Sequence, residues 1–140
     1  MIAAVQEAGI EHPWSHQARA AEHALTGESV VVSTGTASGK SLGYLVPVLS
    51  TLLDGSEAPN GRGATALYLA PTKALAADQR RAVRELAAPL GRAVRPAVYD
   101  GDTPVEEREW VRQYANYVLT NPDMLHRGIL PSHPRWSSFL

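Results

Sequence analysis

The chain has 140 residues and a formal net charge of −1. It is therefore long enough for one domain with a buried core, and it lacks a strong positive field that would attract nucleic acid from a distance. The absence of cysteine excludes disulfides, thiolate zinc sites and cysteine nucleophiles. The first residues lack the basic start of a signal peptide, and the longest apolar run is too short to span a bilayer. We expect a cytoplasmic protein with no membrane partner.

The apolar pattern predicts strands and helices in alternation along the chain. The predicted strands are residues 29–32, 64–70, 94–99 and 114–120. The predicted helices are residues 15–26, 41–53, 72–90, 103–113 and 124–129. Four strand–helix alternations with buried strands indicate an α/β domain with a parallel sheet. In the tail, Trp136 and Phe139 are expected to pack onto that sheet.

The sequence STGTASGKS, residues 33–41, lies between a predicted strand and a predicted helix. Small residues let backbone N–H groups wrap a polyphosphate, and the positive end of the following helix dipole points at the same anion. Thr34 stands where the usual phosphate-loop pattern has its first glycine. Lys40 would contact the β- and γ-phosphates and Ser41 would ligate Mg²⁺, which makes these two the expected catalytic residues. The residues expected to contact the nucleotide here are Thr34, Gly35, Thr36, Ala37, Ser38, Gly39, Lys40 and Ser41.

In a parallel sheet all strand-to-helix loops lie at the carboxyl edge, where ligands bind. This gathers residues 34–41, 71–73, 100–104 and 120–123 on one rim. Each loop opens a helix and offers free N–H donors, so the rim can bind phosphates without a basic surface. Gln17, in the first turn of an earlier helix, is by residue type either a solvated side chain or a reader of an adenine edge.

These loops resemble the motifs of the first RecA-like domain of superfamily-two DExD/H-box helicases, over essentially the whole chain. STGTASGKS resembles motif I, with Ala37 where DEAD-box proteins usually have a glycine. PTKALAADQ at residues 71–79 resembles motif Ia, and TNPDML at residues 120–125 resembles motif Ib. WSHQ at residues 14–17 resembles a Q-motif, in which the glutamine, here Gln17, reads adenine. Together with VYDGDTP, the set is most similar to MrfA/YprA-like bacterial DNA helicases with a DEAH-type second motif.

The resemblance implies a RecA-like P-loop fold with a mostly parallel sheet and helices on both faces, and ATP with Mg²⁺ as cofactors. It also implies ATP hydrolysis coupled to 3′–5′ translocation on DNA, in DNA repair. By the same resemblance, single-stranded nucleic acid, with DNA favoured, would contact Thr72, Lys73, Asp102, Thr120, Asn121 and Asp123. For Asp102, Asn121 and Asp123, helix capping and turn formation are an equally good explanation.

The chain contains no DExH sequence, no Ser-Ala-Thr motif and no second RecA-like domain with its arginine finger. We therefore expect it to be the amino-terminal piece of a longer helicase, inactive alone, with the downstream RecA-like domain as its partner. Residues 1–28 would form an extension with a Q-motif-like helix, and residues 29–140 a RecA-like domain incomplete at its C-terminus. The strand before the phosphate loop would then lack its neighbours.

Other functions remain open. A small-molecule kinase would share the phosphate loop but would not explain PTKALAADQ. An RNA helicase of the same superfamily, or a module that binds nucleotide or single strands without turnover, fits the same residues.

Overall fold

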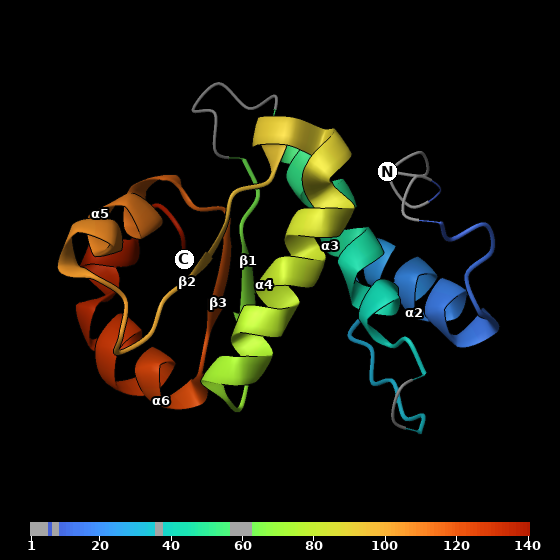
Figure 1. Ribbon diagram of the computed structural model, residues 1–140, viewed down its shortest axis with the longest axis horizontal. Coiled ribbons are helices and arrows are strands. Elements are labelled where there is room, and N and C mark those ends of the chain that lie inside the picture. Colours follow the sequence, from blue (N-terminus) through green and yellow to red (C-terminus); the bar gives the residue numbers. More distant parts are fainter. Residues whose placement is uncertain (1–5, 7–8, 36–37, 57–62) are drawn as a thin grey trace.

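The computed structural model describes residues 6, 9–35, 38–56 and 63–140. At its centre is a three-stranded parallel sheet made of β1 (Ala66–Leu69), β2 (Pro96–Val98) and β3 (Tyr117–Thr120), in the order β1-β3-β2. Figure 1 shows this sheet between two groups of helices. The predicted α/β class with a parallel sheet is confirmed.

The α-helices are α2 (Ser15–Leu25), α3 (Ser41–Gly55), α4 (Lys73–Ala87), α5 (Val105–Tyr114) and α6 (Pro122–Met124). A 3₁₀ segment, Ala88–Ala93, follows α4; a π-helical turn, Leu125–Ile129, and a 3₁₀ segment, Leu130–Trp136, follow α6. Within the described ranges, no helix is both long and apolar enough to cross a membrane. Helix α2 packs along α3, and the boundary predicted between residues 28 and 29 stays a prediction.

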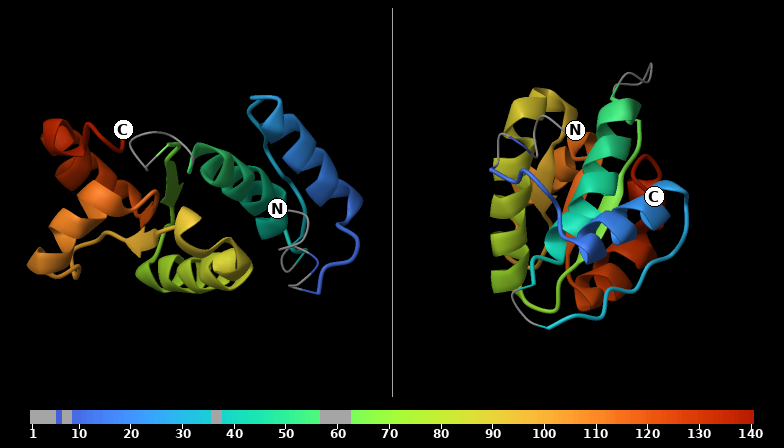
Figure 2. Two further views of the ribbon diagram at one scale, coloured as in Figure 1. Left: turned by 90° about the horizontal axis from the view of Figure 1, so that it is seen from above. Right: turned by 90° about the vertical axis from the view of Figure 1, so that its right-hand side faces the viewer.

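Strand β3 is the buried centre of the sheet. Its side chains alternate between two cores because successive residues of a strand point to opposite faces. Tyr117 and Leu119 join the core formed with α3 and α4, whereas Val118 joins the core formed with α5 and the C-terminal turns. Figure 2 shows these two layers on either side of the sheet. Coverage of both faces explains why every residue of β3 is apolar or, in Thr120, internally hydrogen-bonded.

The C-terminal tail closes the second core, as predicted. Trp136 is 1% exposed and Phe139 5% exposed. The ring of Trp136 meets the ring of Tyr99 edge-on, with 4.7 Å between centroids. The indole therefore connects the tail to the chain that leaves β2.

The predicted strand at residues 29–32 is wrong: these residues form no ladder, and Val31 is 95% exposed. A strand needs a partner to satisfy its backbone groups. The described sheet ends at β1, where Leu67 and Leu69 remain partly exposed. This agrees with the expectation that the segment before the phosphate loop would lack neighbouring strands.

Candidate nucleotide site and nucleic-acid interface

The predicted phosphate loop leads directly into α3, at the same end of the sheet as the beginnings of α4 and α6 (Figure 1). The Lys40 ammonium donates to the carbonyl oxygens of Thr34 (3.1 Å) and Gly35 (2.6 Å) and to Ser38 Oγ (3.3 Å). The Thr34 and Ser38 hydroxyls lie 2.6 Å apart. The loop thus curls around the ammonium group.

Two of the predicted nucleotide contacts, Thr36 and Ala37, lie outside the described residues. The other members of the loop are brought together by the bonds above and by the turn into α3, where Leu42 N–H donates to the Gly39 carbonyl. Their predicted contact with phosphates stays a prediction.

The first turn of α2 holds the phosphate loop from outside. Gln17 Nε2 donates to the Gly39 carbonyl at 2.8 Å, and Gln17 Oε1 accepts from the Trp14 N–H at 2.8 Å. The ring of His16 hydrogen-bonds the Ser38 carbonyl through Nε2 at 2.9 Å. Gln17 is 9% exposed, so the alternative of a solvated surface glutamine is wrong. With respect to the described residues, these bonds leave one N–H and one oxygen lone pair of the amide for a ligand.

Gly39 is required by this contact and by its own backbone. Its φ is +67°, a left-handed conformation that side chains with Cβ rarely adopt. A Cβ at this position would lie 2.6 Å from Gln17 Nε2. The glycine of the Gly-Lys-Ser sequence is therefore what allows the α2 glutamine to approach the loop.

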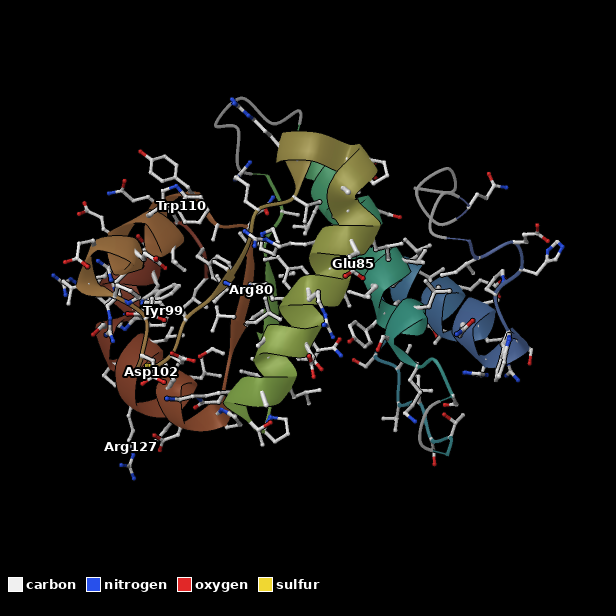
Figure 3. All side chains as sticks on the ribbon, in the orientation of Figure 1. Arg80, Glu85, Tyr99, Asp102, Trp110 and Arg127 are labelled. Carbon is white, nitrogen blue, oxygen red and sulfur yellow. The ribbon has the colours of Figure 1, made fainter. Side chains whose placement is uncertain are left out.

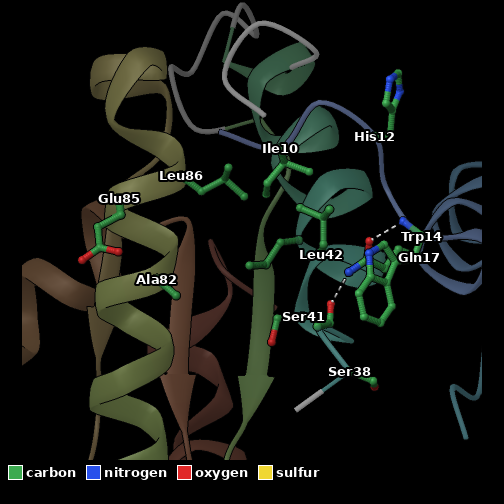
Figure 4. Close-up of a pocket in the computed structure, with 12 residues that line it drawn as sticks. Ile10, His12, Trp14, Gln17, Ser38, Ser41, Leu42, Ala82, Glu85 and Leu86 are labelled. Carbon is green, nitrogen blue, oxygen red and sulfur yellow. Dashed lines mark hydrogen bonds between the residues drawn. The ribbon is translucent and has the colours of Figure 1, made fainter. Parts of the chain in front are cut away.

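A cavity of about 620 Å³ opens beside this junction (Figure 4). It has a polar side made by the phosphate loop and Gln17, and an apolar side made by α3, α4 and the segment before α2. Its lining comprises Ile10, His12, Trp14, Gln17, Ser38, Gly39, Ser41, Leu42, Leu45, Ala82, Glu85 and Leu86. An apolar pocket with a few convergent polar groups suits a flat heterocycle joined to a charged tail.

For Mg²⁺, the first turn of α3 offers the Ser41 hydroxyl, an oxygen of the kind this ion prefers. Among the described residues, no group of three or more His, Cys, Asp or Glu could hold a metal ion by itself. This donor set fits an ion that arrives on nucleotide phosphates, with Ser41 as the protein ligand.

Helix α3 is tied to α4 through Tyr44, three residues beyond Ser41. The Tyr44 hydroxyl donates to Gln79 Oε1 at 2.5 Å. Burial raises the pKa of Tyr44 to about 12, so the phenol remains a donor even in alkaline solution, where an exposed tyrosine would lose its proton. Gln79 is the last residue of the sequence that resembles motif Ia, and the structure shows that it meets the helix of motif I.

The loops after β1, β2 and β3 lie together at the carboxyl edge of the sheet, as predicted, whereas the fourth loop of the predicted rim, residues 34–41, follows no strand of this sheet. The Ala70 N–H donates to the Thr120 carbonyl, and the Tyr99 N–H donates to the Leu119 carbonyl, both at 2.8 Å. These bonds align the loops after all three strands. Lys73, at the start of α4, forms an ion pair with Asp102 from the loop after β2. In Figure 3, Asp102 lies at this end of the molecule, whereas Trp110 lies at the opposite end.

The predicted strand contacts differ in accessibility. Thr72 and Asn121 are helix caps, with side-chain oxygens that accept from Leu75 N–H and Met124 N–H. Asp123 pairs with Arg127 at 3.1 Å. Thr120 is 1% exposed and its hydroxyl donates to the Tyr99 carbonyl at 2.6 Å. Its buried side chain therefore stabilises the rim rather than facing a ligand. Lys73, Asp102 and Asp123 are exposed.

Three contributors were not assigned a role from the sequence. His16 braces the phosphate loop, Trp14 lines the cavity, and Arg108 on α5 donates to backbone carbonyls of the loop after β2. His16 and Trp14 lie within WSHQ, so attention to that whole sequence could have found them. For Arg108 the only signal is its place in the helix that follows the loop, which is weak.

Comparison with known proteins agrees with this geometry. The family model of DEAD/DEAH box helicases matches residues 14–139. "ATP-dependent helicase hrq1" of Schizosaccharomyces pombe is 43% identical over 132 residues, and "Uncharacterized ATP-dependent helicase YprA" of Bacillus subtilis is 43% identical over 136 residues. These alignments cover 93% and 97% of this chain but only 12% and 17% of the relatives.

Solved structures give the same result. The crystal structure of "DUF1998 helicase MrfA bound to DNA and AMPPNP" superposes with a TM-score of 0.86 at 42% identity, covering 97% of this chain and 18% of that one. The RNA-helicase Prp28 of Chaetomium thermophilum bound to ADP superposes with a TM-score of 0.73 at 28% identity, covering 93% of this chain and 31% of that one. The predicted RecA-like fold is confirmed, and the chain belongs to the DEAD/DEAH box helicase family.

Proposed function

We propose that this chain is the ATP-binding and nucleic-acid-binding part of an ATP-dependent DNA helicase. The observation that carries the proposal is the cavity between α2, α3 and α4, which joins an apolar wall to the phosphate loop and to the Gln17 amide, half of which bonds no described residue. ATP has the matching parts: a flat base with hydrogen-bonding edges and an anionic tail.

In this proposal the phosphates lie along the loop that ends at the first turn of α3. Lys40 exchanges the carbonyls of Thr34 and Gly35 for phosphate oxygens, and Ser41 ligates the Mg²⁺ that accompanies them. The positive end of the 15-residue helix α3 adds to the attraction. The base occupies the cavity, where Gln17 offers a donor and an acceptor to the adenine edge.

We place single-stranded nucleic acid on the rim formed by the loops after β1, β2 and β3. Exposed Lys73 supplies the charge, Thr72 and Asn121 fix the loops by capping, and Thr120 supports them from below. DNA is the favoured strand because the similar MrfA structure is described as bound to DNA.

Hydrolysis, strand translocation with 3′–5′ polarity and a role in DNA repair are proposed for a longer protein. The chain spans only 12–17% of the length of its curated helicase relatives. Of the described residues that line the cavity, Glu85 alone is a carboxylate and none is an arginine. Phosphoryl transfer needs groups that place the metal and water and stabilise the developing charge, so we expect this chain alone to bind ATP without turning it over.

Replacing Gln17 with alanine tests the assignment of the base pocket. Gln17→Ala removes the amide proposed to read adenine, so ATP affinity should fall about tenfold while GTP affinity falls less. Competition of ATP and GTP against a fluorescent nucleotide measures both affinities.

The matched control is His16→Ala. This variant removes the neighbouring support of the phosphate loop without touching base recognition, so it should weaken ATP and GTP by the same factor. An unchanged ratio of ATP to GTP affinity in Gln17→Ala would show that Gln17 only positions the loop.

A further inference from the structure

Two exposed cations at or next to the rim are each paired with a carboxylate of the rim in the part of the chain that the structure describes. Lys73 pairs with Asp102, and Arg127 pairs with Asp123 through Nε and Oδ1 at 3.1 Å. All four side chains are more than half exposed, so a strand bound at the rim as proposed could reach them. A phosphate that reaches either cation therefore meets a carboxylate next to it.

The two pairs differ in what they connect. Asp123 and Arg127 are four residues apart on one stretch of chain, a local pair of the kind that contributes little. Lys73 and Asp102 are 29 residues apart. Their pair joins the loop after β1 to the loop after β2, the two outer strands of the sheet.

Asp102 belongs to a loop with a dense hydrogen-bond network. Its N–H donates to Asp100 Oδ1 at 2.9 Å, and the Asp100 N–H donates to Thr103 Oγ1 at 2.8 Å. Asp100 and Thr103 are both buried. Arg108 donates through Nε to the Thr103 carbonyl at 2.9 Å and through Nη2 to the carbonyls of Asp100 and Gly101 at 3.3 Å.

Arg108, which holds this network, is itself held in place. The Arg108 guanidinium lies over the ring of Tyr99, 5.5 Å from its centroid, and Tyr99 packs on buried Trp136. Exposed ion pairs are usually weak because two long side chains must be ordered. Here the aspartate's backbone is held in advance, which leaves the lysine as the main group to be ordered.

We propose that Asp102 limits strand binding by holding Lys73, so that a phosphate of the strand must displace the carboxylate to reach the ammonium. This inference rests on the proposed strand site at the rim. Asp102 then weakens strand binding, whereas a direct contact would strengthen it, because the carboxylate repels phosphate and competes with it for Lys73. The strand is then bound more weakly and released more readily than the exposed cations alone would allow.

The salt dependence of binding follows from the same exchange. A lysine that neutralises a phosphate releases counterion, with a slope of about 0.7 per contact for single strands. When Asp102 is displaced it becomes unpaired and attracts a cation from solution, which cancels part of that release. Lys73 therefore contributes less than a full contact to the slope while Asp102 is present.

The test is a double-mutant cycle on Lys73 and Asp102 in the 140-residue chain. Binding of a labelled single-stranded oligothymidylate is measured by fluorescence anisotropy over a series of sodium chloride concentrations. Asp102→Asn should tighten binding about fivefold, the factor that corresponds to no longer breaking one pair of opposite charges at contact distance in water, and should steepen the salt slope by up to about 0.7. In the Lys73→Ala background both changes should fall to the size of those produced by Asp123→Asn.

Asp123→Asn is the matched control because it removes the same charge from the rim and leaves the Lys73 pair intact. It should tighten binding less than Asp102→Asn, and its effect should be the same with and without Lys73. Since both aspartate side chains are exposed, unchanged thermal melts by circular dichroism are expected for each variant.

Three results would overturn the proposal. Weaker binding by Asp102→Asn would make the carboxylate a direct or structural contact. Equal tightening in the Lys73 and Lys73→Ala backgrounds would reduce its role to general charge. If neither Lys73→Ala nor any aspartate variant changed strand affinity, the strand would not bind at the rim, and that part of the proposed function would be wrong. The proposal for nucleotide binding would not be affected by such a result.

Discussion

Lys40→Ala is expected to abolish tight ATP binding, whereas Lys73→Ala leaves it unchanged. These are the only two lysines of the chain. The two substitutions therefore remove the same charge and the same aliphatic side chain at different positions. Lys40 lies in the phosphate loop with its ammonium among loop oxygens. Loss of one charge-assisted contact costs about 1.5–3 kcal/mol, or about 10- to 150-fold in affinity.

The two variants should exchange roles when the ligand is single-stranded DNA. Lys73→Ala is expected to weaken strand binding and flatten its salt dependence, while Lys40→Ala has little effect on either. Titration of each variant with a fluorescent ATP analogue and with a labelled oligonucleotide gives the four affinities. Near-normal ATP binding by Lys40→Ala would contradict the assignment of residues 34–41 as the phosphate site.

Trp136→Ala is expected to have the largest effect on stability. The side chain is 1% exposed and contacts the rings of both Tyr99 and Phe139 in the core beneath β2 and α5. Truncating a fully buried tryptophan costs about 3–5 kcal/mol, a large part of the 5–15 kcal/mol that holds a typical domain folded. Urea unfolding followed by far-UV circular dichroism measures this loss.

Trp110→Ala is the control for the same chemical change on the surface. Trp110 is 46% exposed on α5, and its ring lies tilted at 41° to that of Tyr114, with 6.2 Å between ring centroids. Its truncation should change the free energy of unfolding by less than about 1 kcal/mol. Equal losses in the two variants would mean that the C-terminal tail is not part of the second core.

The strands that form the sheet could be predicted because their apolar runs are followed by clear helix starts. Thr72 and Asn121 cap the next helical turns as their residue types suggest. The run at 29–32, SVVV, is richer in β-branched residues than any of the three strands and yet forms no strand. Composition reports a preference for extended backbone, but a ladder depends on a neighbour that is far away in the sequence or absent from it.

The candidate site was predictable where one residue type has one role, as for the glycine and lysine of the phosphate loop. It was less predictable where a polar side chain has several possible partners. Gln17 by type could face solvent or a base, and its burial against Gly39 depends on a contact 22 residues away. An aspartate such as Asp102 could cap a helix, form a turn or bind a ligand. Its pairing with Lys73 could not be predicted, because it depends on the order of the strands in the sheet.

The central claim, an ATP site between α2 and α3, is tested most directly by nuclear magnetic resonance of the isotope-labelled chain during titration with ATP and Mg²⁺. The amide signals of Gly39, Lys40 and Ser41 and the side-chain amide of Gln17 should shift and saturate together. The amides of Lys73, Asp102 and Asn121 on the rim should move little. Saturable shifts at the rim with none in the loop, or no saturable shift at all, would contradict the ATP site.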